Sequence, residues 1–424
     1  MKILIVSYEA WRDTNNGGNV LSNIFFSFDN TEIAQIYCSG ELPSNTICSK
    51  YFQISDSMLL NATKGRRLEE KIYKNDDDSQ NNVFENTVKR RTPSFLRETA
   101  LLMRELLWDI TNWKTKELRN FVEKFKPDLI FAPCYTYSHV SKLALYIQKI
   151  LGCPMVSYIS DDNYSLRCLS FSPFFWINRL KTRKWIRRHF AKCRLIYTMT
   201  DLQKKEYEKI FGIPFKVLCK AADFDKVEKR TINKPIQLIY GGGLYLNRWQ
   251  VLGELSNILN QINKDKIVAQ MHIYSNTKLN SRKTKLLNDK RNSFLHASIP
   301  YDELEKKYQQ SDIAIHVESF DLRNRLITRL SFSTKIIDCM NSGCAILAIG
   351  PQTQAGMAYL RDNDAAICVN ELSTLHSKVS DVLFHPETIF FYSKQAKKLG
   401  KKNHTINNIN AMIRNDFSII IKNR

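Results

Sequence analysis

The stretch SFSTKIIDCMNSGCAILAIGP, residues 331–351, joins a hydroxyl pair, a lysine and one acid to a helix pattern and a strand pattern. Ser333 is a typical N-cap residue, so Thr334 and Lys335 are expected in the first helical turn. Gly343 fits just beyond the helix end. The apolar run AILAIG that follows is typical of a strand buried on both faces. A helix leading into a buried strand is half of a Rossmann-type unit.

The same alternation surrounds this stretch in the C-terminal half of the chain. A Gly-Gly-Gly turn follows the first predicted strand of this half, and Pro stands at an early position of a later helix. We predict strands at 235–240, 267–275, 294–299 and 312–318, with helices at 248–262 and 300–311.

The N-terminal half repeats the pattern without repeating the sequence. We predict strands at 2–8, 32–39, 126–133, 154–160, 194–199 and 214–220, with helices at 20–28, 138–151 and 201–211. The predicted fold class is therefore α/β, with two Rossmann-like domains that face a central cleft. The predicted boundaries are an N-terminal domain 1–220 with a mobile polar insertion at about 61–98, a linker 221–234, a second domain 235–385 and a helical C-terminal segment 386–424.

Composition limits the function classes. The 63 basic and 42 acidic residues give a net charge of +21, which indicates an anionic partner or a lysine-rich proteome. The ten cysteines form no CxxC pair and no zinc-finger spacing, which favours a reducing cytoplasm without disulfides or structural zinc. The N-terminal apolar run is too short for a signal peptide, and no segment approaches a membrane span.

The chemistry of the opening stretch points to a nucleoside diphosphate. A helix N-terminus with a hydroxyl and Lys335 suits a phosphate. Asp338, three residues later on the same helix face, can accept the two hydroxyls of a ribose. Arg248 follows the glycine turn, where its guanidinium can pair with phosphate. The alternative is an ordinary capped core helix with one snorkelling lysine.

Four segments resemble the donor domain of retaining GT-B-fold glycosyltransferases, closest to the family-4-like (group 1) enzymes of bacterial surface polysaccharide synthesis. They are YGGGLYLNRW (240–249), SIPYDELEKKYQQSDIAIH (298–316), HVESF (316–320) and the opening stretch. The resemblance covers about 230–385, and the N-terminal half matches mainly in strand order.

The resemblance implies a role for each matching residue. By motif order, Arg248 and Lys335 bind the donor phosphates, Glu318 is the first acid and Asp338 is the second. The implied donor site also includes Gly242, Gly243, Ile299 beside the base, Ser333 and Thr334, whereas His316 either reaches the sugar or packs in the core. The sequence departs from the family because Glu318 and Asp338 lie twenty positions apart, with the basic DLRNRLITRL between them.

The N-terminal half offers two further candidates. Gly17 and Gly18 follow the first strand in a loop that, in the family, lines the cleft near donor and acceptor; a simple flexible turn is the alternative. Asp161 and Asp162 follow another strand and could orient or deprotonate the acceptor hydroxyl, although such pairs also form turns and caps. A metal pattern at 76–78 lies in the polar insertion, so no metal site is expected.

The segment 172–194 alternates aromatic and basic residues and contains no acid. Such a helix is typical of a membrane surface, or of a solvated helix whose aromatic side chains pack on the sheet. If the helix lies on a membrane, we expect the residues that contact lipid to be Trp176, Arg179, Lys181, Arg183, Trp185 and Arg187.

The expected function is transfer of a sugar from a nucleotide sugar to a hydroxyl of a glycan, with retention, in capsule, O-antigen or exopolysaccharide synthesis. The expected partners are a lipid-linked acceptor and the inner face of the plasma membrane, with the nucleotide sugar as co-substrate and no metal or other cofactor. Two other classes remain open: a nucleotide-sugar epimerase of the same architecture, and a basic nucleic-acid-binding protein, for which the sequence has no recognition motif.

Overall fold

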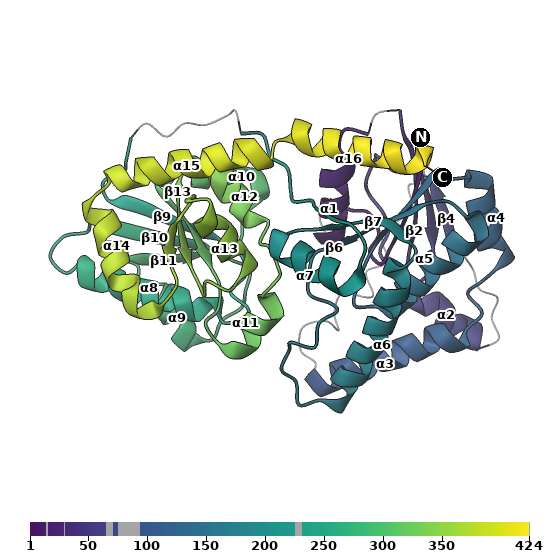
Figure 1. The fold of residues 1–424 in the computed structure, drawn as a ribbon. Helices are drawn as coiled ribbons and strands as arrows, with labels where there is room; N and C mark the ends of the chain where they lie inside the picture. Colours follow the sequence, from purple (N-terminus) through teal and green to yellow (C-terminus); the bar gives the residue numbers. More distant parts are fainter. Residues whose placement is uncertain (14–15, 29, 65–70, 75–93, 225–230, 424) are drawn as a thin grey trace. The chain divides into compact units, whose positions relative to one another are not determined.

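The structure is a computed structural model that describes residues 1–13, 16–28, 30–64, 71–74, 94–224 and 231–423. The chain forms two compact units, one of Met1–Leu218 with Asn410–Arg424 and the other of Cys219–Ile409. Each unit contains a mainly parallel sheet covered by helices (Figure 1). This confirms the predicted α/β class with two Rossmann-like sheets.

The sheet of the first unit has the strand order β4-β3-β2-β1-β5-β6-β7-β8. Its pairs are parallel except β3 with β4, and its central strands are buried along most of their length, as their apolar runs predict. The strands are β1 Lys2–Ser7, β2 Glu32–Tyr37, β3 Lys50–Gln53, β4 Lys71–Lys74, β5 Leu129–Pro133, β6 Met155–Ile159, β7 Cys193–Thr198 and β8 Phe215–Val217.

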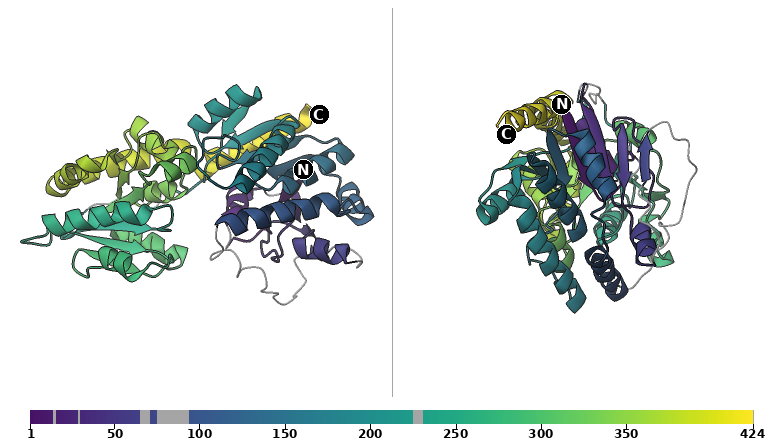
Figure 2. Two further views of the ribbon diagram at one scale, coloured as in Figure 1. Left: turned by 90° about the horizontal axis from the view of Figure 1, so that it is seen from below. Right: turned by 90° about the vertical axis from the view of Figure 1, so that its right-hand side faces the viewer.

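The helices of the first unit connect these strands and cover the sheet (Figure 2). They are α1 Asn16–Phe25, α2 Asp56–Thr63, α3 Ser94–Ile110, α4 Lys116–Phe125, α5 Ser138–Leu151, α6 Pro173–Phe190 and α7 Asp201–Phe211. A last helix, α16 (Ile406–Lys422), ends in this unit. Among the described residues, no helix is long and apolar enough to cross a membrane.

The second unit has a six-stranded parallel sheet in the order β11-β10-β9-β12-β13-β14. Its strands are β9 Ile236–Gly241, β10 Ala269–Tyr274, β11 Ser293–His296, β12 Ile313–Val317, β13 Ala345–Ile349 and β14 Ile367–Val369. Its helices are α8 Arg248–Ile262, α9 Ser281–Leu287, α10 Tyr301–Gln310, α11 Leu322–Thr328, α12 Lys335–Asn341, α13 Ala355–Asp362, η1 Leu372–Thr374, α14 Leu375–Phe384 and α15 Glu387–Asn403.

The predicted insertion at 61–98 includes ordered structure at both ends. The end of α2, the edge strand β4 and the start of α3 all lie within it. Residues 65–70 and 75–93, with the metal pattern at 76–78, lie outside the described residues, as do 225–230 of the predicted linker. The described start of that linker is packed, because Ala222 donates its N–H to the carbonyl of His404 at 2.9 Å.

The end of the chain packs on the first unit. In α16, Asn410 donates to Ser27 Oγ at 2.7 Å, and Asp416 accepts a hydrogen bond from Tyr197 at 2.8 Å. Because Asp416 is buried, the Tyr197 hydroxyl satisfies a group that would otherwise be costly to desolvate. Helix α16 is therefore fixed by polar bonds to β7 and to the segment that follows α1.

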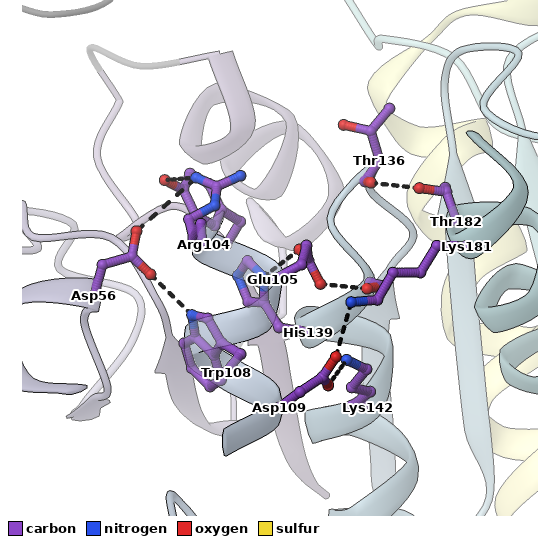
Figure 3. A network of polar contacts seen from close by, with 12 residues as sticks. Asp56, Arg104, Glu105, Trp108, Asp109, Thr136, His139, Lys142, Lys181 and Thr182 are labelled. Carbon is purple, nitrogen blue, oxygen red and sulfur yellow. Dashed lines mark hydrogen bonds and ion pairs between the residues drawn. The ribbon is translucent and has the colours of Figure 1, made fainter. Parts of the chain in front are cut away.

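Polar side chains attach α3 to the rest of the first unit (Figure 3). Glu105 lies 2.7 Å from Nδ1 of the buried His139, and Trp108 donates to Asp56 at 2.8 Å. Arg104 donates to the hydroxyl of Tyr8 at 3.1 Å and lies 4.0 Å from Asp56. Arg104 and Glu105 of α3 therefore point toward the protein.

Asp56, Glu105 and Asp109 each have a hydrogen-bond or ion-pair partner in this network. Burial opposes ionisation of Glu105, but hydrogen bonds from His139 and Ser138 outweigh it and lower its pKa to about 2. Asp109 is held by two lysines, with Lys181 at 2.8 Å. The network is thus a set of internal ion pairs that ties α3 to α2, α5 and α6.

Candidate functional site

Three predicted residues come together at the carboxyl ends of β9 and β12. Arg248 is the first residue of α8, Glu318 follows the last residue of β12, and Lys335 is the first residue of α12. Strands β9 and β12 are parallel neighbours, so the segments that leave them emerge at the same edge of the sheet. The fold therefore gathers side chains that are far apart in the sequence.

Arg248 and Glu318 form a partly buried ion pair. Nη2 of Arg248 lies 3.3 Å from each carboxylate oxygen, whereas its Nε is buried without a hydrogen-bond partner. Burial raises the pKa of Glu318 by more than the Arg248 charge lowers it. The pair fixes the guanidinium but leaves one of its donors unused.

Lys335 lies against the glycine turn that follows β9. A methyl group at Gly242 would lie 1.8 Å from Lys335 Nζ, so only glycine lets the ammonium occupy this position. Among the described residues, Lys335 has no ion-pair partner within 4.0 Å. Burial, and then the charge of Arg248, lower the pKa of Lys335 to about 8.

His316 lies in β12 next to this pair. Its Nε2 is 3.7 Å from Glu318 Oε1 and is buried without a hydrogen-bond partner. Burial, and then the charges of Arg248 and Lys335, lower the pKa of His316 to about 3, so the ring is neutral at pH 7. Two cations therefore share one carboxylate, and the cluster carries excess positive charge that an anion would neutralise.

The sequence analysis missed the residues that position Arg248. Asn247, immediately before it, is in the left-handed region with φ 57° and donates to Asp321 at 3.1 Å. Asp321 also caps α11 by accepting from the Asn324 backbone at 3.0 Å. The basic segment between Glu318 and Asp338 thus contains a helix, and the residue that caps this helix also holds the turn before Arg248. The Asp-x-x-Asn spacing in the sequence could have predicted this cap.

Asp338 has internal partners. Its Oδ1 accepts from Lys220 at 2.5 Å and from the Tyr301 hydroxyl at 3.0 Å. Neither partner was predicted. Lys220 ends the predicted N-terminal domain, but in the structure it belongs to the second unit, with Asp338. A ribose hydroxyl at Asp338 would have to bind Oδ2 or displace one of these donors.

Two details of the opening stretch differ from expectation. Helix α12 begins at Lys335 with Thr334 at the N-cap, so the prediction of Ser333 as N-cap is wrong by one residue. Neither hydroxyl caps the helix, because Thr334 already has helical dihedrals and the carbonyl of Ser333 bonds to Ile336 in a tight first turn. Gly343 has φ 79°, as predicted for the residue beyond the helix end.

Gly243 and Ile299, the other residues predicted to bind the donor, each lie in a segment that follows a strand of the same sheet. Gly243 leaves room for the ring of Tyr245, since a methyl group would lie 2.0 Å from it. Tyr245 in turn lies 5.6 Å from the Arg248 guanidinium. Ile299 is half-buried in the segment between β11 and α10.

Gly17 and Gly18 lie in the first turn of α1, and the prediction that they form a loop is corrected. The N–H of Gly17 donates to Glu9 at 2.8 Å, and a methyl group at Gly18 would lie 2.0 Å from the carbonyl of Arg12. Glycine is therefore needed because the backbone that leaves β1 passes directly over the start of α1.

Asp161 and Asp162 have different surroundings. Asp162 is buried and accepts hydrogen bonds from the Ser165 backbone at 2.8 Å and from Tyr207 at 2.9 Å. Burial opposes its ionisation, but these bonds outweigh burial and lower the pKa of Asp162. Asp161 is exposed. The geometry favours a structural role for Asp162 and leaves Asp161 as the accessible carboxylate.

The side chains of α6 that were predicted to face lipid have partners within the protein, and their contact with lipid stays a prediction. Arg179 donates to the carbonyls of Asp162 and Ser165, and Arg183 and Arg187 bind Tyr164. The Lys181 ion pair with Asp109 and the bond from Trp176 to the Ser170 carbonyl are also internal, and Trp185 is covered by Arg188 at 4.8 Å. Arg179, Arg183 and Arg187 hold the segment 160–170 through these bonds, although Arg187 is also exposed.

No protein-family model and no curated protein matches this chain. Solved structures do. Sucrose-phosphate synthase from Thermosynechococcus elongatus matches with a TM-score of 0.63 at 10% identity, over 100% of both chains. HepE from Anabaena, solved in complex with UDP, matches with a TM-score of 0.62 at 12% sequence identity, over 99% of this chain and 100% of the HepE chain.

A third solved structure, TarM, matches with a TM-score of 0.63 at 10% identity, over 98% of both chains. The similarity extends over both units, so it is not limited to the segments that resemble a donor domain in sequence. The chain therefore has the GT-B fold.

Proposed function

We propose that the protein is a glycosyltransferase that moves a sugar from a nucleoside diphosphate sugar to a hydroxyl of an acceptor. The observation that carries the proposal is the excess positive charge beside Gly242, where Arg248 and Lys335 share Glu318. A diphosphate supplies the missing negative charge at the position expected from the fold.

The chemistry follows from that charge. The bond between the anomeric carbon and the diphosphate oxygen breaks, and negative charge accumulates on the leaving diphosphate. Arg248 and Lys335 stabilise this charge without reorganising, since both are already fixed by packing. The acceptor oxygen forms the new bond and loses its proton. These two cations would supply the charge that a metal supplies elsewhere, so the proposed reaction needs no metal.

Neighbouring groups would hold the rest of the donor. Asp338 is proposed to accept a ribose hydroxyl through Oδ2, and Ile299 to lie beside the base. His316 is neutral, so its unpartnered Nε2 is suited to a sugar hydroxyl and not to a phosphate. Retention of the anomeric configuration is proposed from the sequence resemblance alone.

The acceptor is proposed to be a lipid-linked glycan of bacterial surface polysaccharide synthesis, met at the inner face of the plasma membrane. Asp161, the exposed carboxylate after β6, is proposed to orient or deprotonate the acceptor hydroxyl. This part of the proposal rests on the sequence resemblance and the accessibility of Asp161.

A release assay tests the proposal. Purified protein is mixed with a panel of nucleotide sugars, beginning with UDP-sugars because HepE was solved with UDP-glucose, and free nucleoside diphosphate is measured. We expect release from at least one donor, and at least about 100-fold less release in Lys335→Met. The control Lys266→Met, an exposed lysine of the same unit, should release diphosphate like the wild type.

The same assay separates the alternative activity. An epimerase converts the donor sugar without releasing nucleoside diphosphate, so the sugar recovered from donor alone is identified as well. Conversion without release, or equal release by Lys335→Met and wild type, would contradict glycosyl transfer at this site.

A further inference from the structure

Helices α3 and α6 direct several polar side chains toward the protein. In α3, Glu98 and Glu105 are buried, and Asn178 of α6 donates to the Glu98 carbonyl at 3.0 Å. In α6, Arg179 is 11% exposed and Thr182 is buried, donating to the Thr136 carbonyl at 2.8 Å. An ordinary surface helix keeps such polar side chains on its solvent face.

The outward faces of the two helices are apolar. The helices lie side by side in the first unit (Figures 1 and 2). Met103 and Ile110 of α3 are 61% and 67% exposed, and Leu180 of α6 is 56% exposed. We call this surface the α3–α6 face; its exposed apolar residues are Leu96, Met103, Leu106, Ile110, Ile177 and Leu180, with Phe171 before α6.

A cationic stripe continues this face along α6. Ile177, Leu180, Lys184 and Arg188 follow one another at helical spacing, and the last two are exposed. Helix α6 contains no acid, and the exposed acid of α3 nearby, Asp109, is already paired with two lysines. Apolar side chains beside unopposed cations match a bilayer whose headgroups are anionic.

We propose that the α3–α6 face docks on an anionic lipid bilayer, with the apolar residues entering the headgroup region and Lys184 and Arg188 meeting lipid phosphates. The proposal uses Lys184 and Arg188 because Arg179, Arg183 and Arg187 donate hydrogen bonds to the segment before α6. The inference extends the proposed function, since a lipid-linked acceptor lies in a membrane, but it does not depend on catalysis.

Flotation with vesicles tests the docking. Full-length protein is mixed with two kinds of vesicle. One kind contains phosphatidylcholine alone, and the other contains phosphatidylcholine with about 30% phosphatidylglycerol, an anionic lipid. We expect flotation with the anionic vesicles only. Met103→Gln/Leu180→Gln should lower the partition coefficient at least about tenfold, and Lys184→Gln/Arg188→Gln about 30-fold.

Matched variants isolate the surface. Phe384→Gln/Ile419→Gln removes equally exposed apolar residues elsewhere, and Lys264→Gln/Lys266→Gln removes exposed cations elsewhere; both should float like the wild type. Circular dichroism and diphosphate release should be unchanged in all four variants, so failure of docking is distinguishable from failure of the proposed function.

Three outcomes would overturn the inference. They are absence of wild-type flotation on anionic vesicles, equal flotation of the Met103→Gln/Leu180→Gln variant, and a dimer in light scattering that this variant alone abolishes. The last would assign the face to a second copy of the chain.

Discussion

The two units each contain a buried charged cluster near the carboxyl ends of their strands, and the clusters differ in charge balance. In the first unit, Asp56 and Glu105 face Arg104 and His139. The surroundings favour the charged forms of Glu105, whose pKa falls to about 2, and of Arg104, whose pKa rises despite burial, whereas burial lowers the pKa of His139. In the second unit the surroundings oppose the Lys335 charge, and its pKa falls to about 8.

The difference separates a structural network from a binding site. Both clusters contain buried charged groups, so buried charge by itself does not identify a functional site. A cluster in which each acid has a partner is complete and holds helices together, whereas we propose that the extra cation of the second cluster is destabilising until an anion arrives. The two clusters should therefore respond differently to substitution and to pH.

The largest expected effect is on Lys335. Because the folded pKa is about 8 and that of a free lysine is 10.5, the folded protein resists protonation, and this cost is fully present below pH 8. Lys335→Met should therefore lower turnover about 100- to 1,000-fold and yet raise the free energy of unfolding by up to about 3 kcal/mol at pH 7. Urea unfolding and the release assay measure the two quantities.

The pH dependence of this stabilisation provides the control. The gain in Lys335→Met should decline between pH 8 and 10.5, where the native lysine is already neutral and the unfolded one is not. A variant that is less stable than wild type at pH 7 would mean that Lys335 has a structural partner.

Glu105 should behave in the opposite way. Its depressed pKa contributes stability above pH 4.5 that is lost as the pH falls toward 2. Glu105→Gln should lower the free energy of unfolding by up to about 3 kcal/mol at pH 7, with little difference near pH 2. Equilibrium unfolding at several pH values tests this, and diphosphate affinity of the folded variant should be retained. Weakened diphosphate binding in folded Glu105→Gln would remove the contrast between the clusters.

Donor affinity should depend on pH through Lys335. Above pH 8 the lysine loses its proton, so diphosphate affinity should fall, by at most about tenfold per pH unit. Fluorescence titration between pH 6.5 and 9.5 measures it. Lys335→Arg stays charged over this range, so a similar decline in that variant would assign the pH dependence to another group.

The smallest effect is expected at His316. With a pKa of about 3, it stays neutral at physiological pH, and turnover should show no inflection near pH 6.5. His316→Ala should lower turnover about tenfold through one lost hydrogen bond to the sugar. Steady-state kinetics against pH checks both statements; an inflection that disappears in His316→Ala would show that the ring titrates in the working range.

The fold was predictable because its strands are buried on both faces and read as apolar runs between helices of ordinary spacing. Helices α5 and α8 begin and end where the sequence predicts. The edge strand β4 and its neighbour β3 were missed because a strand of four residues has too few positions to form a pattern.

Parts of the site were not predictable for a different reason. Lys335 and Arg248 stand in recognisable local patterns, but the Lys220 partner of Asp338 is 118 residues away in the sequence. The inward turn of Arg179 was also hidden, because its partners are backbone carbonyls, which leave no residue-type signal. Contacts of this kind are set by tertiary packing and need coordinates.

The central claim is that an anion completes the charge of the Lys335 cluster, and proton uptake on binding measures this directly. Calorimetric titration of UDP at pH 8, in two buffers of different ionisation enthalpy, should show uptake of up to about half a proton, because Lys335 is half protonated when free and fully protonated beside a diphosphate. Lys335→Arg should bind UDP without this uptake. Equal uptake in both proteins, or no UDP binding by the wild type with every other nucleoside diphosphate also failing, would contradict the account.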